Sequence, residues 1–490
     1  MKVVLLACLT VFLATCSQPP GLLEEIRAAG ELRVVTRISP TTYYNGPNGP
    51  LGPEYELAKG FADFLGVTLK IVPVDHFAEL IPLIESGSAH LAAAGLTVTD
   101  ARAKRVEFGP SYQQVSQSLI YKRRKAKPRR PADLIGKRIE VGVGTSYVER
   151  LARLQAEEPR LVFSENPNAD VAELILAVAR GDIDYTVADS HLLRIYRNLA
   201  PEIREGFELS AGDSLAWAMP RRRDHSLAEQ VDAYFEKIRS NGQLSRIMDR
   251  YYGHTGRFDY VGTHRFLRDA RNKLPLYREL FENAANATGT DWRLLAAIGY
   301  QESRWNPDAV SPTGVRGIMM LTQRTADVIG VDDRIDPAQS IVGGADYLNR
   351  MKRRLPPDIT DPDRTWFALA AYNVGFGHVR DARRLAAADG QDSRLWVHVR
   401  PYFEKLTQRR WYRQAKHGYA PGWEPVMYVE NVRNYYDILR WLDWKQEQEK
   451  RRHSPPATIV EASSQPPPAD TVLRSVPTRT EELLQKIATF

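Results

Sequence analysis

The chain has 490 residues, which is too long for one ordinary hydrophobic core, so two or three domains are expected. Its hydrophobic content of 43% and charged content of 26% are typical of globular protein. The net charge of +7 is modest for this length, and Lys and Arg are not concentrated in any one segment. This composition excludes a strong nucleic-acid footprint, and we expect no nucleic-acid partner.

The first sixteen residues have the layout of an export signal. An apolar run from Val3 to Leu13 follows a short positive start, and it is far shorter than the ~20 residues that a bilayer requires. The run ends in Leu13-Ala14-Thr15-Cys16, which resembles the lipobox of bacterial lipoproteins. The resemblance implies a signal peptide over residues 1–15, a lipid anchor on Cys16 and a lipidated linker over 16–29. Ser17 after the Cys favours the periplasmic face of the outer membrane.

The chain has two cysteines, Cys8 inside the apolar run and Cys16 at the expected cut. A mature chain would have no thiol free to pair, so we expect no disulfide. The alternative is an uncleaved apolar N-terminus with two incidental thiols. We expect neither a metal ion nor a cofactor.

Short apolar runs alternate with helical patterns from about residue 30 to Tyr252. The runs 32–36, 67–72, 138–143 and 184–188 predict strands. The segments Glu54–Leu65, Phe77–Ser86 and Tyr147–Ala156 predict helices. This alternation predicts βαβ units and a mostly parallel sheet, in an α/β domain over 30–258.

After Gly253 the pattern is helical, with almost no convincing strand. Helices are predicted over Tyr277–Ala287, Asp291–Ser303, Ala338–Arg354, Thr365–Tyr372 and Tyr428–Gln446. We assign an all-α domain to residues 259–447. The remainder, 448–490, is first highly charged and then rich in Pro and Ser. Such composition buries too little apolar area to offset chain entropy, so it predicts a disordered tail, with Glu481–Thr489 as a candidate short helix.

Six short motifs give residues 30 to 252 a resemblance to the periplasmic amino-acid-binding receptors, family 3 of the solute-binding proteins. They are Gly52-Pro-Glu-Tyr-Glu-Leu-Ala, Ala94-Gly-Leu-Thr-Val-Thr-Asp-Ala-Arg, Val106-Glu-Phe-Gly-Pro-Ser-Tyr, Asp133-Leu-Ile-Gly-Lys, Gly142-Val-Gly-Thr-Ser-Tyr and Gly181-Asp-Ile-Asp-Tyr-Thr-Val-Ala-Asp. The resemblance implies two α/β lobes that close on a small ligand. That ligand is an amino acid or a peptide piece of the cell wall, since both carry an ammonium and a carboxylate.

Five residues are expected to bind this ligand. Arg102 offers a planar fork of donors to a carboxylate, and Asp189 accepts hydrogen bonds from an ammonium; the resemblance implies the same pair. Thr145 and Ser146 lie where a strand gives way to a helix, so their amides and hydroxyls face an anion, and Thr97 adds a contact. The alternatives are a surface turn capped by Arg102 and a helix N-cap formed by Asp189.

An acidic residue lies on the apolar face of one predicted helix. Thr290-Asp291 is a plausible N-cap, and Leu295, Ile298 and Glu302 follow at helical spacing. Burial of a carboxylate costs free energy unless the group is protonated, paired or functional. The alternative is a glutamate that turns to solvent at the helix end.

Four further motifs carry a second resemblance. They are Gln301-Glu-Ser-Arg-Trp-Asn-Pro, Ser311-Pro-Thr-Gly-Val-Arg-Gly-Ile-Met-Met-Leu-Thr with Thr325-Ala, Ala370-Ala-Tyr-Asn-Val-Gly, and Tyr419-Ala with Tyr428-Val-Glu-Asn-Val. They resemble the soluble-type lytic transglycosylases, which have a goose-lysozyme-like α-fold. Together the two modules cover about residues 30–445, and their order resembles that of the F-type membrane-bound lytic transglycosylases.

The second resemblance implies that Glu302 is both acid and base on peptidoglycan. It protonates the oxygen between N-acetylmuramic acid and N-acetylglucosamine, then accepts the proton of the muramyl C6 hydroxyl as a 1,6-anhydro ring closes. No water is consumed, so the implied enzyme is a lyase. We expect it to cut from chain ends, and cleavage inside the glycan strand is the alternative. Burial in an apolar pocket must raise the pKa of Glu302 toward neutrality.

The same resemblance assigns substrate-binding roles to Ser303, Ser311, Met320, Tyr372, Asn373 and Tyr428. The serines orient the carboxylate or the acetamido group, while the Asn373 amide contacts sugar and the Tyr372 phenol contacts the carboxylate. Met320 stands where many relatives carry Gln, which removes an amide contact to the glycan. Ordinary turn serines and core packing of Tyr428 remain alternatives.

Two other functions stay open: hydrolysis with water, as in goose-type lysozyme, and a receptor whose α-domain is an inactive wall-binding anchor. In the leading interpretation the N-terminal ligand regulates the enzyme, which requires that it bind the active arrangement more tightly. The segment Gln408–Arg413 mixes cations and aromatics; we favour a solvated loop over sugar stacking on Trp411.

Overall fold

The computed structural model of the protein describes residues 21–46, 49–255, 260–312 and 314–453. The predicted signal peptide, the lipidation of Cys16 and the helix expected over Glu481–Thr489 lie outside the described residues. Within the described part of the chain, no helix is both long and apolar enough to cross a membrane.

A five-stranded sheet forms the first lobe of the N-terminal half, in the order β4-β1-β5-β12-β6. Its strands are β1 (Glu31–Arg37), β4 (Thr68–Val74), β5 (Leu91–Ala92), β6 (Val106–Phe108) and β12 (Ala218–Pro220), with a hairpin of β2 (Tyr44–Gly46) and β3 (Gly49–Leu51). β1 is parallel to β4 and β5, whereas β12 is antiparallel to its neighbours. Side chains alternate along β1, so Leu32 and Val34 enter one apolar cluster and Val35 enters another.

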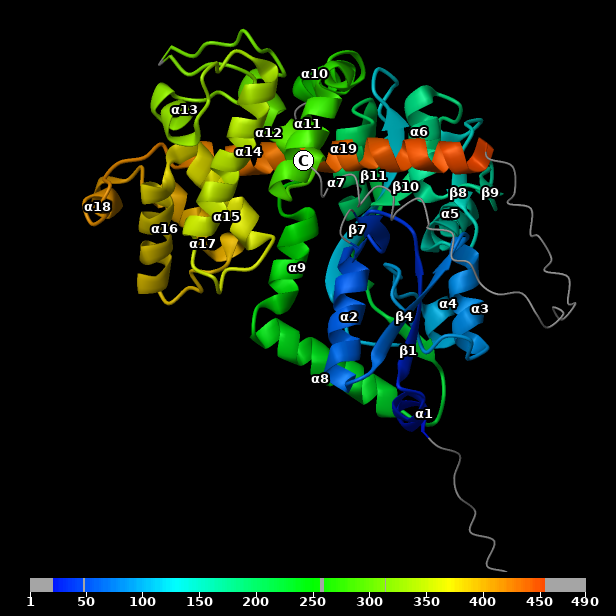
Figure 1. Cartoon of the computed structure of the whole chain (residues 1–490). Coiled ribbons are helices and arrows are strands. Elements are labelled where there is room, and N and C mark those ends of the chain that lie inside the picture. Colours follow the sequence, from blue (N-terminus) through cyan, green and yellow to red (C-terminus); the bar gives the residue numbers. More distant parts are fainter. Residues whose placement is uncertain (1–20, 47–48, 256–259, 313, 454–490) are drawn as a thin grey trace, which may run out of the picture. The chain divides into compact units, whose positions relative to one another are not determined.

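Helices cover both faces of this sheet (Figure 1). They are α1 (Leu22–Ala29), α2 (Pro53–Leu65), η1 (Phe77–Glu79), α3 (Leu80–Glu85), α4 (Asp100–Ala103) and α8 (Ser226–Ser240). α1, α2 and α8 share the cluster of Leu32 and Val34, and α3 shares that of Val35. The linker predicted over 16–29 is wrong for its second half, because Leu22 and Ile26 of α1 are buried in this core.

The second lobe is built on β7, which is antiparallel to both β10 and β11. Its elements are β7 (Gln113–Lys122), η2 (Pro131–Leu134), β8 (Glu140–Gly142), α5 (Ser146–Glu157), β9 (Ser164–Asn166), α6 (Val171–Arg180), β10 (Tyr185–Asp189), α7 (Ser190–Leu199) and β11 (Ile203–Leu215). The expectation of a mostly parallel sheet is therefore wrong for this lobe. The apolar pattern did not reveal β7 because Gln117 and Ser118 are buried at its centre, where they donate to Ser146 and Glu205.

From α9 onward the described chain is helical. The helices are α9 (Gln243–Tyr252), α10 (Tyr260–Asn272), α11 (Leu274–Thr288), α12 (Trp292–Ser303), α13 (Gln323–Ile329), α14 (Pro337–Arg354), α15 (Asp363–Val374), α16 (Phe376–Ala388), α17 (Trp396–Lys405), α18 (Arg409–Tyr412) and α19 (Trp423–His453). The predicted fold class, a two-lobed α/β part followed by an all-α part, is confirmed. α19 extends to His453, past the boundary predicted at 447.

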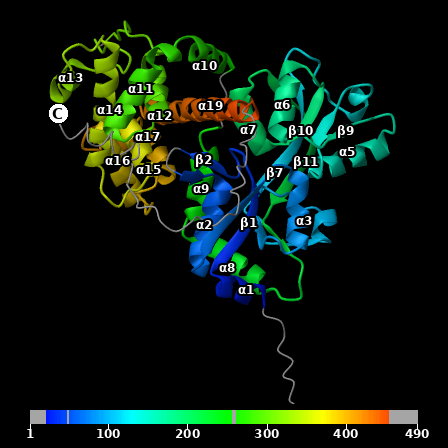
Figure 2. The ribbon, with the colours of Figure 1, turned by 45° about the vertical axis from the view of Figure 1, so that its right-hand side comes forward.

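Two of these helices run through the core of the helical part. Leu294–Tyr300 in α12 and Thr365–Ala371 in α15 are unbroken runs of buried residues. A helix that is buried on all sides must be enclosed by others, and α11, α14, α16 and α17 contact this pair. α19 lies beside α12, where the rings of Tyr300 and Tyr435 meet edge to face (Figures 1 and 2).

Candidate active site

Glu302 lies in the last turn of α12, where the chain turns sharply. Asp291 caps the start of this helix by accepting from the Arg293 amide at 3.0 Å. Past its end, Arg304 and Trp305 have φ angles of +56° and +53°, a left-handed conformation that non-glycine residues rarely adopt. Trp305 is fully buried and its indole donates to the Ala296 carbonyl at 2.8 Å, so packing maintains the turn.

The Glu302 carboxyl is half-buried and accepts a hydrogen bond of 2.6 Å from the Tyr428 hydroxyl. Burial raises the pKa of Glu302 to about 7, while the hydrogen bond from Tyr428 acts in the opposite direction. The expected rise is thus confirmed, and the alternative of a glutamate in bulk solvent is excluded. A carboxyl that is near half protonation at neutral pH can both give and take a proton.

Tyr428 enters the site from α19. Its side chain is almost completely buried, and burial together with the neighbouring Glu302 raises the pKa of Tyr428 well above its usual value. The phenol therefore keeps its proton and stays a donor. The core-packing interpretation is confirmed, and the hydroxyl also contacts the Glu302 carboxyl. A contact of Tyr428 with substrate stays a prediction.

Tyr372, on α15, does not contact the Glu302 carboxyl as the resemblance implied. Its hydroxyl donates to the Met319 carbonyl at 2.8 Å, and its ring stacks against Tyr428 with 6.5 Å between centroids. The predicted contact between the Tyr372 phenol and the carboxylate is therefore wrong, because the phenol donates its proton to a backbone carbonyl. Asn373, the next residue, is exposed, and its contact with sugar stays a prediction.

Ser303 and Ser311 form hydrogen bonds with backbone groups near Glu302. The Ser303 hydroxyl lies 2.9 Å from the Ile318 carbonyl and 3.1 Å from that of Gly299, so its single proton is engaged with the main chain. Ser311 accepts from the Val315 amide at 3.1 Å within a turn. Ser303 thus positions Glu302 by joining α12 to the following loop, and orienting the carboxylate directly is not its role in this structure.

The loop from Ser311 to Leu321 needs unusual backbone angles. Gly317 has a φ of +86°, and a Cβ there would lie 1.8 Å from the Arg334 carbonyl oxygen, so only glycine fits. Met320 also has a positive φ, of +47°, and its side chain is half-buried. Close backbone packing, rather than side-chain contacts, shapes this part of the site.

A separate hollow lies in the α/β half, and four of the five predicted ligand residues line it: Thr97, Thr145, Ser146 and Asp189. The fifth, Arg102, is buried but does not line the hollow. Its guanidinium donates to the carbonyls of Thr97 at 2.8 Å and Gly144 at 2.9 Å. The structure therefore brings the five predicted residues together, but the Arg102 guanidinium binds backbone carbonyls and does not face the hollow.

Asp189, which lines this hollow, has a buried carboxyl oxygen without a hydrogen-bond partner among the described residues. This atom is its Oδ1, and the residue as a whole is buried. Burial raises the pKa of Asp189 to about 7, against hydrogen bonds from Gln117 and Tyr147. Asp189 is the N-cap residue of α7, as the alternative had it, but its side chain makes no capping hydrogen bond. A buried carboxylate of this kind suits a ligand ammonium.

Sequence reasoning missed Arg37 and Phe77, which also line the hollow. Arg37 pairs with Asp170 at 3.1 Å, and its guanidinium lies 5.8 Å from the centre of the Phe77 ring. Arg37 ends strand β1, and ligands of α/β sheets bind outside the carboxyl ends of strands. That position was the signal that could have identified it.

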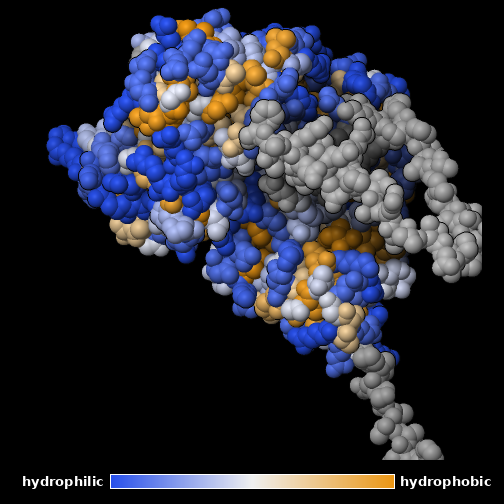
Figure 3. All heavy atoms as spheres, in the orientation of Figure 1, coloured by the Kyte–Doolittle hydropathy of each residue, from blue (hydrophilic) through white to orange (hydrophobic). Residues whose placement is uncertain are grey.

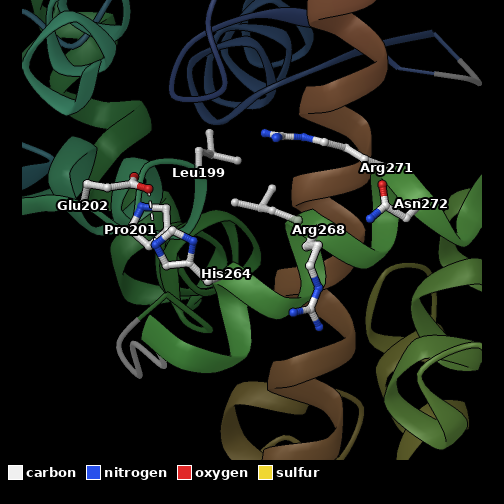
Figure 4. Close-up of a pocket in the computed structure, with 8 residues that line it drawn as sticks. Leu199, Pro201, Glu202, His264, Arg268, Arg271 and Asn272 are labelled. Atoms are coloured by element: carbon white, nitrogen blue, oxygen red, sulfur yellow. Dashed lines mark ion pairs between the residues drawn. The ribbon is translucent and has the colours of Figure 1, made fainter. Parts of the chain in front are cut away.

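A second hollow, of about 340 Å³, contains none of the predicted site residues (Figure 4). Leu199, Pro201, Glu202, His264, Leu267, Arg268, Arg271 and Asn272 line it. The His264 imidazole is 3.2 Å from the Glu202 carboxylate, and Arg268 and Arg271 are exposed to solvent. Leu199, Pro201 and Leu267 are buried, so this hollow has both apolar and solvated polar lining residues.

The two halves of the chain match two family models. Residues 32–254 match the bacterial extracellular solute-binding proteins, family 3, and residues 279–394 match the transglycosylase SLT domain. Fold and site together thus define a solute-binding module joined to a transglycosylase module.

Similar proteins share most of this length. The membrane-bound lytic murein transglycosylase F 1 of Alkalilimnicola ehrlichii is 48% identical over 424 residues, covering 86% of each chain. The membrane-bound lytic murein transglycosylase F of Stutzerimonas stutzeri is 46% identical over 433 residues, covering 88% of this chain and 89% of that protein. The chain therefore belongs to the membrane-bound lytic murein transglycosylase F family. Among solved structures, an ancestral arginine-binding protein bound to arginine is 25% identical, with a TM-score of 0.42 and coverage of 46% of this chain and 98% of that one.

Proposed function

We propose that this protein is a peptidoglycan lytic transglycosylase that cleaves the β-1,4 bond between N-acetylmuramic acid and N-acetylglucosamine without water. The observation that carries the proposal is the Glu302 carboxyl, half-buried, 2.6 Å from the Tyr428 hydroxyl and with a pKa of about 7. Family membership supports the reaction class.

The reaction uses Glu302 twice. Protonated Glu302 donates to the glycosidic oxygen, and the bond from that oxygen to muramyl C1 breaks. Ionised Glu302 then takes the proton of the muramyl C6 hydroxyl, whose oxygen bonds to C1. The hydrogen bond from Tyr428 stabilises the ionised form between the two steps. All atoms of the substrate remain in the two products, one of which ends in a 1,6-anhydro ring.

A single carboxyl group distinguishes this site from that of most glycoside hydrolases, which use two. Among the described residues, no second Asp or Glu is close enough to affect the pKa of Glu302. The C6 hydroxyl of the sugar thus replaces the water that a second carboxylate would activate. This favours the lyase over the lysozyme-type hydrolase.

The test is Glu302→Gln, which keeps the shape of the side chain and removes the transferable proton. We expect turnover of purified peptidoglycan to fall about 10²–10⁴-fold, the usual contribution of a general acid and base. Glu279→Gln on α11, an exposed glutamate, is the matched control and should keep full activity. Unchanged turnover by Glu302→Gln would mean that another group is the catalyst, or that the helical module is only a wall anchor.

For the N-terminal module we propose a regulatory ligand, an amino acid or a muropeptide. Asp189 binds its ammonium, Thr97, Thr145 and Ser146 surround it, and Arg102 meets its carboxylate once the backbone carbonyls release the guanidinium. Asp189→Asn should weaken binding of a free cell-wall stem peptide by at least tenfold in calorimetry. Undiminished binding would contradict this assignment.

We further propose that the protein is held at the periplasmic face of the outer membrane by a lipid on Cys16. The lipobox-like motif supports this, as do the names of the relatives, which describe them as membrane-bound. Metabolic labelling with a fatty acid should mark the parent chain and leave Cys16→Ala unlabelled. Labelling of both chains, or of neither, would reject the anchor.

A further inference from the structure

Two large aromatic side chains remain exposed just before and at the start of α19. Tyr419 is 59% exposed and Trp423 is 51% exposed, and within the described residues they are the two exposed aromatic side chains. Figure 3 shows that most of the face it displays is hydrophilic. Aromatic rings are normally the side chains that gain most from burial, so a pair left in water indicates a binding surface.

The backbone under these rings is fixed. A Cβ on Gly422 would lie 1.5 Å from the Phe403 carbonyl oxygen, so this segment packs directly on the end of α17. Ala420 is buried, and the Tyr412 ring meets Tyr419 edge to face with 5.9 Å between centroids. The rings are therefore held outward by a rigid support, which lowers the entropy lost when a ligand binds.

Trp423 lies near Tyr428, the hydrogen-bond partner of the acid, along the axis of α19. Trp423 is the first residue of α19, and Tyr428, whose hydroxyl contacts Glu302, follows five residues later. At 1.5 Å per residue the two positions are about 7.5 Å apart along the helix. Five residues also turn the helix by about 140°, so the exposed Trp423 and the buried Tyr428 face different sides of α19. A long polymer that runs from Glu302 past the first turn of α19 can reach Trp423, whereas a single disaccharide at Glu302 does not need it.

The segment that carries the two rings is rich in positive charge. Residues 409–424 contain four Lys and Arg side chains and one Glu. Arg409 and Arg413, one helical turn apart, are both exposed, and the contact between Tyr412 and Tyr419 joins their segment to the rings. The ligand that matches this surface has flat apolar faces for the rings and carboxylates for the arginines.

We propose that Tyr419 and Trp423 form a stacking platform for sugar rings of an intact murein strand, with Arg409 and Arg413 pairing with carboxylates of its peptide stems. This deepens the proposed function, on which it rests, by assigning the residues that favour a long, peptide-bearing strand. Trp411 is not part of the platform, because Lys405 and Arg410 lie over its ring at 4.6 Å and 5.2 Å.

The test measures binding separately from turnover. In a Glu302→Gln background, cosedimentation with purified sacculi should show dissociation constants about tenfold higher for Trp423→Ala and for Tyr419→Ala, as for an exposed anchor at an interface. Trp423→Phe, which keeps a flat ring, should retain most of the binding. Leu276→Ala removes an exposed side chain on α11 and should bind like the background protein.

Three results would overturn the platform. They are unchanged binding of both alanine variants, an equal loss in Trp423→Phe, and a loss explained by a lowered melting temperature. The arginine pair is tested by Arg409→Ser with Arg413→Ser, which should reduce the salt dependence of binding to sacculi. Because binding is measured in an inactive background, this outcome is independent of whether Glu302 is the catalyst, which the turnover assay decides.

Discussion

At the scale of single residues, the site depends on one carboxyl group whose ionisation the fold has made unfavourable. Glu302 is crowded by protein on most sides and receives one hydrogen bond, from Tyr428. The pKa of about 7 reflects a burial penalty larger than that bond. Burial of Glu302 lowers the free energy of unfolding at neutral and alkaline pH, and it keeps a carboxyl proton available near pH 7.

Glu302→Gln should therefore make the protein more stable at alkaline pH. The pKa of Glu302 is about 7 when folded and near the ordinary value of 4.5 when unfolded, so the folded state holds the extra proton between these values. The free energy of unfolding consequently falls as pH rises through that window. In urea titrations the variant should be about 1–3 kcal/mol more stable than the parent at pH 8, with a smaller gap at pH 5. A gap independent of pH would contradict the assigned pKa.

Tyr428→Phe should move the pH profile. Without the hydrogen bond the ionised form of Glu302 loses its stabilisation, so its pKa rises further and the alkaline limb of the rate profile shifts to higher pH. We expect kcat to fall about tenfold, because the base step needs the ionised form. The measurement is kcat on peptidoglycan from pH 5 to 9, with Tyr412→Phe as the control. A shift of the limb to lower pH would contradict the role given to this phenol.

At the scale of elements, the turn after α12 and the loop that follows decide where the acid points. Ser303 joins the helix to Ile318, and Gly317 lets the loop pass against the Arg334 carbonyl. These contacts involve the backbone, so a small change of loop path moves the whole carboxyl.

Gly317→Ala should be far more damaging than Gly314→Ala. Both glycines have positive φ angles, of +86° and +80°, but a Cβ at Gly314 meets nothing within 4 Å. The shared backbone cost is about 1 kcal/mol, and the clash at Gly317 adds to it. Thermal unfolding together with kcat should show a several-fold larger effect at Gly317. Equal effects would mean that the close backbone contact is unimportant.

The elements themselves were predictable where the apolar pattern was strong. α11, α12, α14 and α15 lie within about three residues of their predicted ranges, and the motif around Glu302 identified the candidate acid. β7 was missed because its buried centre is polar, and α17 was obscured by Pro401 inside the helix. The contact between Glu302 and Tyr428 joins residues 126 positions apart, and no local pattern encodes such a pairing.

At the scale of the whole molecule, α19 contacts both Glu302 and the end of α9. Arg433, fully buried on α19, donates to the carbonyls of Asp249 at 2.6 Å and Arg250 at 3.0 Å at the end of α9. Tyr428 lies five residues earlier on the same helix. A shift of α9 on ligand binding would therefore be transmitted to the hydrogen bond on Glu302.

This connection predicts that the ligand effect depends on Arg433. A saturating free stem peptide, which has no glycosidic bond, should change the rate on sacculi by about fivefold or more. Arg433→Lys keeps the charge but loses the forked donor, so the ratio of rates with and without peptide should approach one. The rate without peptide is the internal control. No effect of saturating peptide on the parent enzyme would reject regulation by this module.

The most direct test of the central claim is the mass of the products released from purified sacculi by the parent enzyme. Transfer of the C6 oxygen to C1 predicts muropeptides that end in 1,6-anhydro rings, and their disappearance in Glu302→Gln. Products heavier by one water, with reducing ends, would show that water is the nucleophile and would contradict the mechanism.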